Sequence, residues 1–310
     1  MELKQLEYIV KIAEEGSITK AAEKLFISQS GLNQQLLKLE SDLGQQLFHR
    51  GKNDFRLTEA GEIYVDYARR ILSLKQEAYN KLNDLANNQT GRLRLGLTPE
   101  RGINMLMNVY PAFYRQYPNI TIEPQEINIH QQLSMIAKGY LDLGFVTLSE
   151  EDKTNDEYVH IYYENILLAV PRSNPLAANG APPGEPFATA DLSKFRSEKF
   201  VLMFKDSTLR RVIDPLFKEA GFAPQILFET SSNVTLRNMV KNQLACSLIS
   251  HNYAKDQEDI AYFYLPSRPF WELCATYKRG HYLTKAASSF LELAIQHYRK
   301  TALENHQSIV

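Results

Sequence analysis

Residues 17–50 read SITKAAEKLFISQSGLNQQLLKLESDLGQQLFHR and predict two short helices joined by a tight turn. Along the second helix, leucines recur at i, i+4, i+7 and i+11 and therefore lie on one face (Leu32, Leu36, Leu39 and Leu43). The other side carries hydroxyl, amide and ammonium groups, which bind base edges and phosphates in DNA. These residues are Ser28, Gln29, Ser30, Asn33, Gln34 and Lys38. We therefore expect the second helix to lie in a DNA groove.

The first helix of the pair begins after Ser17, a residue type that caps helix N-termini. Ala21 and Ala22 form its inner face, and their small side chains let the second helix approach closely, as a helix-turn-helix requires. Gly31 is unusual, because glycine inside a helix costs about 1 kcal/mol relative to alanine. Either the first turn tolerates it, or it lets the backbone approach a phosphate.

A hairpin is predicted next, over the segment LFHRGKNDFRLT at residues 47–58. Its tip at residues 51–54 consists of turn-favouring residues, so the segment fits the wing of a winged helix-turn-helix. Arg50, Lys52 and Asn53 are the residues expected to contact the DNA backbone from this wing. An ordinary solvated hairpin is the alternative interpretation.

A long helix is predicted from Thr58 to about Asn87. Within it Tyr64, Ile71, Ala78 and Leu85 recur every seven residues, and Tyr67 and Leu74 supply a second position that Lys81 interrupts. This imperfect heptad pattern favours a short helix pair between two copies of the chain. The alternative is a single amphipathic helix that packs on its own core. Residues 3–15 are expected to form a further helix before the pair.

Together, the sequence segments described so far resemble the DNA-binding domain of LysR-type transcriptional regulators. The matching segments are LKQLEYIVKIAEEGSITKAAEKLFISQSGLNQQLLKLESDLGQQLFHR and FRLTEAGE. The chain departs from the family in its recognition helix, where Ser30 and Gly31 replace the usual proline or alanine, and Asn33 and Gln34 replace serine and arginine. The departures affect the operator sequence and not the fold. The resemblance implies a homodimer or homotetramer on double-stranded DNA, with RNA polymerase as a further partner of an activator.

The composition of the 310-residue chain gives little indication of DNA binding. Its formal net charge is −1, and residues 1–58 carry eight basic against eight acidic side chains, so the interpretation rests on pattern. The hydrophobic fraction of 44% is enough for more than one domain. Cys246 and Cys274 lie in apolar segments and are expected to be buried thiols. With no signal peptide or membrane-spanning run visible, we expect a cytoplasmic protein.

After the polar segment NNQTG at residues 87–91, strands and helices alternate. Their βαβαβ order predicts a parallel sheet, and the pattern restarts after about residue 165. We therefore expect two α/β lobes, with the chain crossing between them near Tyr163 and Arg268. The predicted domains are a winged helix-turn-helix (1–58), a linker or dimerisation helix (59–91) and an effector domain (92–310). Its lobes would be 92–163 with 269–310, and 164–268. The family resemblance implies a periplasmic-binding-protein-like fold here.

A ligand site is expected where strands lead into helices, because helix N-termini in open α/β sheets face ligands. The candidate residues are Thr98, Pro99, Glu100, Arg101, Asn128, His130, Gln131, Thr147, Ser207, Thr230, Ser232 and Asn233. They suit a small polar effector, with a carboxylate as the favoured group and Arg101 or Arg210 as its charged partner. The alternative is that these residues are ordinary helix caps. Glu100 argues against an anion, because its own carboxylate would repel one.

Enzymatic function is not expected, because the sequence contains no GxSxG, HExxH, P-loop or GxGxxG motif. The seven histidines lack the spacing of metal ligands, and no cofactor is predicted. The chain is interpreted as a DNA-binding transcriptional regulator modulated by a small molecule held between two lobes. Two alternatives stay open. In the first, the chain is a regulator whose C-terminal domain serves only oligomerisation or protein contacts. In the second, it is a solute-binding protein or enzyme that carries an additional N-terminal helical domain.

Overall fold

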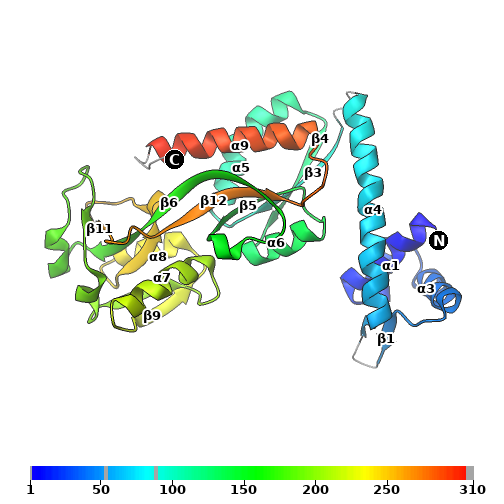
Figure 1. Cartoon of the computed structure of the whole chain (residues 1–310), viewed down its shortest axis with the longest axis horizontal. Helices are drawn as coiled ribbons and strands as arrows, with labels where there is room; N and C mark the ends of the chain where they lie inside the picture. Colours follow the sequence, from blue (N-terminus) through cyan, green and yellow to red (C-terminus); the bar gives the residue numbers. More distant parts are fainter. Residues whose placement is uncertain (1, 52–54, 87–89, 305–310) are drawn as a thin grey trace. The chain divides into compact units, whose positions relative to one another are not determined.

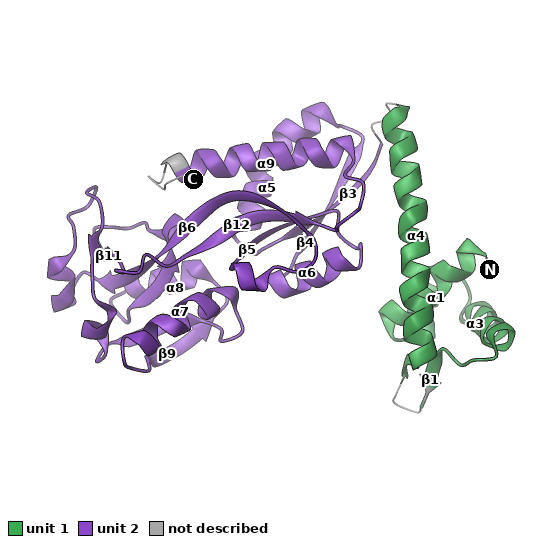
Figure 2. Ribbon diagram, in the orientation of Figure 1, with its two compact units in different colours: residues 1–88 green, residues 89–310 purple. Residues whose placement is uncertain are grey.

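The computed structural model describes residues 2–51, 55–86 and 90–304. The chain divides into two compact units, residues 1–88 and residues 89–310 (Figure 2). No helix among the described residues is long and apolar enough to cross a membrane.

The first unit is a winged helix-turn-helix followed by a long helix, as predicted. Its elements are α1 (Leu3–Glu15), α2 (Ile18–Lys24), α3 (Gln29–Leu43), β1 (Phe48–Arg50), β2 (Phe55–Leu57) and α4 (Glu59–Leu85). Ser17 and Ser28 cap α2 and α3 through their side chains, and Ala21 and Ala22 are buried between the helices. Leu43, the last leucine of the predicted face, lies at the end of α3 and is 44% exposed.

The apolar residues of α4 divide between two surfaces. Tyr64 and Ile71 pack against Leu6 and Val10 of α1, so the predicted heptad seam is wrong at these two positions. A second row stays exposed in this chain: Tyr67, Leu74, Ala78, Leu82 and Leu85. One face of the helix therefore covers the unit's own core, and another carries an uncovered apolar row; pairing with a second copy of the chain stays a prediction.

The second unit is built on an eight-stranded sheet with the order β4-β3-β5-β12-β6-β11-β7, to which β10 adds by pairing with β6. The strands are β3 (Gly91–Leu97), β4 (Ile120–Glu126), β5 (Leu143–Leu148), β6 (Glu157–Pro171), β7 (Ala188–Thr189), β10 (Ser247–Ser250), β11 (Ile260–Tyr264) and β12 (Phe270–Tyr277). A parallel pair, β8 (Lys199–Met203) and β9 (Gln225–Thr230), belongs to the second lobe. As the βαβαβ pattern predicts, β3 pairs in parallel with both β4 and β5.

Five helices cover this framework: α5 (Arg101–Gln116), α6 (Ile129–Ala137), α7 (Thr208–Glu219), α8 (Asn233–Lys241) and α9 (Lys285–Glu304). In the first lobe, α5 and α9 lie together on one face of the sheet and α6 lies on the other (Figure 1). The second lobe has its own large core around α7, α8 and β8. Cys246 and Cys274 lie in these cores, and burial raises the pKa of both thiols to about 12, as expected of structural cysteines.

The long strand β6 joins the two lobes. Residues up to Asn165 pair with β12, and residues from Ile166 onward pair with β10 and β11. The chain returns between Tyr264 and Phe270, where Arg268 adopts a positive φ of 47°. Both positions lie beside the predicted crossings, although the sequence did not reveal that one continuous strand makes the first of them.

Candidate functional site

The exposed side of α3 carries the predicted base-reading residues. Ser28, Gln29, Ser30, Gln34 and Lys38 are exposed, and Asn33 is half-buried. Behind them Leu32, Leu36 and Leu39 are buried in the unit's core. The helix is therefore amphipathic in the sense expected, with an uncovered polar face.

Gly31 has a local role in this helix start. The Ser28 hydroxyl accepts a hydrogen bond from the Gly31 backbone N–H at 3.1 Å, which caps α3. A Cβ at residue 31 would lie 2.9 Å from that hydroxyl oxygen. Because this atom ends a flexible side chain, a small shift of Ser28 would accommodate a Cβ, and the first turn of α3 tolerates glycine without requiring it.

The wing is fixed to α3 by a buried carboxylate. Oε1 of Glu40 accepts hydrogen bonds from the backbone N–H groups of Leu47 at 2.8 Å and Phe48 at 3.3 Å. Phe48 stacks on Phe55 across the hairpin, with ring centroids 4.9 Å apart. The wing therefore keeps a set position beside the recognition helix. The predicted contact residues Lys52 and Asn53, and the side chain of Arg50, lie outside the described part of the chain.

The second unit contains a cavity of about 250 Å³ between its lobes, where the first turns of α6 and α7 and the residues beside α5 and α8 converge. Eight of the twelve predicted effector residues line it: Thr98, Pro99, Arg101, Asn128, His130, Thr147, Ser207 and Asn233. The first N–H groups of a helix lack intrahelical partners. Those of Ile129, His130, Thr208 and Leu209 belong to residues that line this cavity. The cavity therefore offers both polar side chains and helix N-termini.

Four predicted residues do not line the cavity: Glu100, Gln131, Thr230 and Ser232. Gln131 completes a capping box with Asn128 at the start of α6. The Ser232 hydroxyl donates to Oε1 of Glu100 at 2.5 Å, and the Thr230 hydroxyl accepts from the Ser232 N–H at 3.2 Å. These four side chains thus take part in hydrogen bonds with neighbouring groups.

The sequence did not reveal the apolar wall of the cavity. Met203, Phe204, Leu209, Tyr253 and Trp271 line it and lie outside the predicted strand–helix junctions. In the sequence Met203 and Phe204 belong to the apolar run FVLMF, which looks like ordinary core. No local signal separates them from core residues, because only the folded chain brings Tyr253 and Trp271 to the cavity.

Arg101 is buried at the edge of the cavity and paired with a buried carboxylate. Its Nη1 lies 2.6 Å from Oε2 of Glu164, and its Nη2 donates to the Ser250 hydroxyl at 3.0 Å. Burial alone would lower the pKa of Arg101, but the charge of Glu164 outweighs this and raises it well above the usual range. The other proposed cation, Arg210, does not line the cavity and is held by Asp214 and Glu229.

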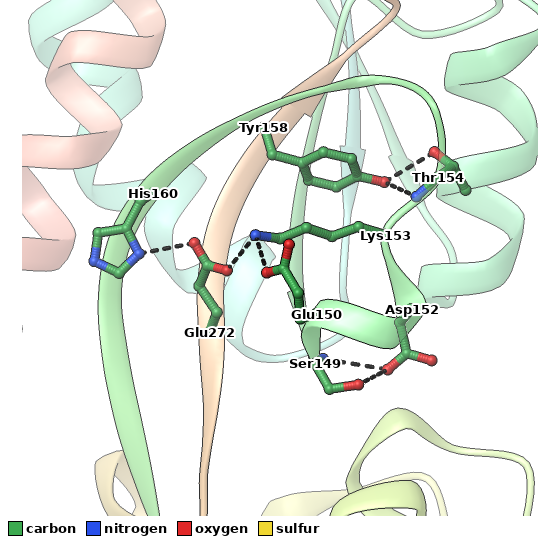
Figure 3. Close-up of polar contacts among 8 residues, drawn as sticks. All are labelled: Ser149, Glu150, Asp152, Lys153, Thr154, Tyr158, His160 and Glu272. Atoms are coloured by element: carbon green, nitrogen blue, oxygen red, sulfur yellow. Dashed lines mark hydrogen bonds and ion pairs between the residues drawn. The ribbon is translucent and has the colours of Figure 1, made fainter.

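Besides the contacts of Arg101 with Glu164 and Ser250, further contacts join the lobes around the cavity. They include the Ser232–Glu100 hydrogen bond, a bond between Nε2 of His130 and the carbonyl oxygen of Asp206 at 3.2 Å, and an ion pair between Asp152 and Arg211. Figure 3 shows what holds Asp152 in place: its carboxylate accepts from the Ser149 N–H and hydroxyl, while the neighbouring Lys153 lies between Glu150 and Glu272. The two lobes are thus linked to each other on several sides of the cavity.

Comparison with known proteins agrees with this architecture. Residues 3–62 match the model of the bacterial regulatory helix-turn-helix proteins of the LysR family, and residues 86–299 match the LysR substrate binding domain. The chain belongs to the LysR family. It is accordingly a DNA-binding transcriptional regulator with an effector-binding domain.

Curated relatives cover most of the chain. An uncharacterised HTH-type regulator YcgK of Bacillus subtilis is 27% identical over 97% of this chain and 96% of its own length. A probable RuBisCO transcriptional regulator of Synechocystis is 30% identical over 80% of this chain and 71% of its own length.

Solved structures share the fold of this LysR-family chain. A full-length OxyR variant from Pseudomonas aeruginosa has a TM-score of 0.68 at 24% identity, covering 96% of this chain and 98% of its own. Full-length CbnR in complex with its target DNA has a TM-score of 0.57 at 24% identity, covering 97% of this chain and 100% of its own.

Proposed function

We propose that this LysR-family regulator reads its operator with the polar face of α3 and responds to a small carboxylate bound between its lobes. The observation that carries the effector proposal is the cavity of about 250 Å³, which is lined by residues of two helix first turns and by capping hydroxyl and amide groups. Such a lining attracts anions through backbone N–H groups and the positive ends of helix dipoles. The residues proposed to bind are Thr98, Asn128, His130, Thr147, Ser207 and Asn233.

The proposed mechanism is a shift between open and closed lobes. A ligand moves such an equilibrium only by binding one state more tightly than the other. The cavity is lined from both lobes, so an effector that fills it favours the closed state. In a dimer joined through α4, that shift changes the spacing of two DNA-binding heads and so the sites that they contact.

The proposed partners are operator DNA, a second copy of the chain through the exposed row of α4 and, where the protein activates transcription, RNA polymerase. We assign the protein no catalytic role and place it in the cytoplasm with the DNA that it reads. The alternative, a second unit that serves assembly alone, would leave the cavity without a function, and no observation favours it.

The single tryptophan of the chain provides the test. Trp271 lines the cavity, so its fluorescence reports ligand entry into the full-length protein. A panel of small carboxylates is titrated against the wild type and against Thr98→Val, which removes a lining hydroxyl. We expect a saturable change that the variant weakens. A panel that leaves the fluorescence unchanged, while the protein still selects DNA from a random duplex library, would refute the carboxylate proposal.

A further inference from the structure

The buried ion pair at the edge of the cavity restricts the charge of the ligand. Arg101 lines the cavity, its buried Nη1 is ion-paired with Oε2 of Glu164 at 2.6 Å, and its Nη2 donates to the Ser250 hydroxyl at 3.0 Å. A guanidinium has five N–H donors. Arg101 therefore keeps donor capacity for a ligand while its positive charge is already matched.

Glu164 cannot turn away from Arg101 without losing other bonds. Its Oε2 accepts from the Trp271 indole N–H at 2.9 Å, and its Oε1 accepts from the Asn252 backbone N–H at 2.9 Å. The side chain is completely buried on β6, opposite Trp271 on β12. The negative charge is thus held beside Arg101 by both crossing strands and by the second lobe.

This arrangement treats charged and uncharged ligand groups differently. A second carboxylate at Arg101 would place two negative charges around one buried guanidinium. That leaves an unmatched charge out of water, which is strongly unfavourable. An uncharged acceptor, such as an amide, ketone or hydroxyl oxygen, receives the same hydrogen bond and keeps the pair neutral.

We propose that the effector is a singly charged acid whose second polar group is an uncharged hydrogen-bond acceptor, and that Glu164 is the residue that excludes diacids. The inference rests on the proposed carboxylate site. The carboxylate binds at the first turns of α6 and α7, and the uncharged acceptor binds Arg101. The body of the ligand packs against the apolar wall formed by Met203, Leu209 and Trp271.

Isosteric pairs of acids test the proposal directly. The probes are succinate and succinamate, glutarate and glutaramate, and adipate and adipamate, in which only one terminal group changes from carboxylate to amide. They are titrated into the full-length wild type with Trp271 fluorescence as the readout. We expect the half-amide of the best-fitting pair to bind at least about tenfold more tightly than its diacid. Equal binding, or tighter binding of the diacid, would overturn the inference while leaving the carboxylate site intact.

If Glu164 is the residue that excludes diacids, a substitution there should reverse the preference for the half-amide over the diacid. Glu164→Gln keeps the shape and removes the negative charge, so Arg101 becomes available to a second carboxylate and the diacid should now bind more tightly. Glu157→Gln is the matched control, because Glu157 lies on the same strand but is only half-buried and pairs with Arg279. It should keep the wild-type preference. If Glu164→Gln does not fold, the wild-type comparison decides alone. If no acid of either kind binds the wild type, the carboxylate site itself is wrong and this inference falls with it.

Discussion

Gly61 lies in the first turn of α4, where the helix passes the end of the wing. A Cβ at this position would lie 2.0 Å from the carbonyl oxygen of Leu47, a backbone atom that cannot rotate away. Thr58 adds to the same junction, since its hydroxyl caps α4 and donates to the Gln46 carbonyl oxygen at 2.6 Å. The space beside the Cα atom of residue 61 therefore accommodates a hydrogen atom but not a Cβ atom.

We therefore expect Gly61→Ala to destabilise the first unit by about 3 kcal/mol, because the helix and wing must separate. The control is Gly44→Ala, where the space is open but φ is 64°, which costs about 1 kcal/mol. Urea unfolding followed by circular dichroism measures both. Equal losses in the two variants would show that the close contact at Gly61 is relieved without strain.

At the residue scale, the sequence identifies features that depend on near neighbours. Ser17, Ser28 and Asn128 could be assigned as caps because a cap bonds within the next three residues. Glu40 could not be recognised as the anchor of the wing, and Glu164 could not be recognised as the partner of Arg101. Each of these bonds depends on a tertiary contact, for which a single sequence carries no signal.

At the scale of elements, the polar face of α3 identifies the side chains that we expect to recognise operator bases. We expect Asn33→Ala with Gln34→Ala to lose about 1–3 kcal/mol for each lost bidentate base contact and to accept more sequences. Site selection from a random duplex library, followed by fluorescence anisotropy, measures both effects. Glu23→Gln on α2 serves as a control outside α3. A double variant that binds as tightly and as selectively as the wild type would contradict the assignment of the recognition helix.

The exposed row of α4 predicts self-association. Leu74→Glu places a charge in the middle of this row, where an apolar contact with a second copy would bury it. We expect the dimer dissociation constant to rise at least about tenfold, as measured by analytical ultracentrifugation. Gln76→Glu adds the same charge at an exposed polar position of the helix and should leave the dimer intact. Unchanged association of Leu74→Glu would exclude this row as the contact.

Elements with a strong period were predicted well, and β6 was not. Helices such as α1 and α4 repeat an apolar pattern over many residues, whereas β6 changes its partners at Asn165 and therefore has no single pattern. The polar half of the cavity followed from strand–helix junctions. Its apolar half did not, because Tyr253 and Trp271 reach the cavity from distant segments.

At the scale of the second unit, one of the contacts between the lobes lies outside the cavity. Arg211 of α7 pairs with Asp152 of the first lobe and does not line the cavity. Its side chain is 53% exposed, so solvent screens the pair and its contribution is at most about 1 kcal/mol. Asp152 is held in position by Ser149, so the loss of Arg211 leaves a buried carboxylate without its partner from the other lobe.

Arg211→Ala should therefore shift the unit toward open lobes without touching the ligand site. We expect faster hydrogen exchange in residues 149–156 and in the first turn of α7, together with up to about fivefold weaker binding of the best half-amide, because less of the protein is in the competent state. Arg279→Ala is the control, since this arginine is similarly exposed but pairs with Glu157 and Asn155 within the first lobe. Exchange and affinity that match between the two variants would mean that the Asp152–Arg211 pair does not hold the lobes together, and that closure depends on the other contacts between the lobes, such as Glu100–Ser232, His130–Asp206 and Arg101–Ser250.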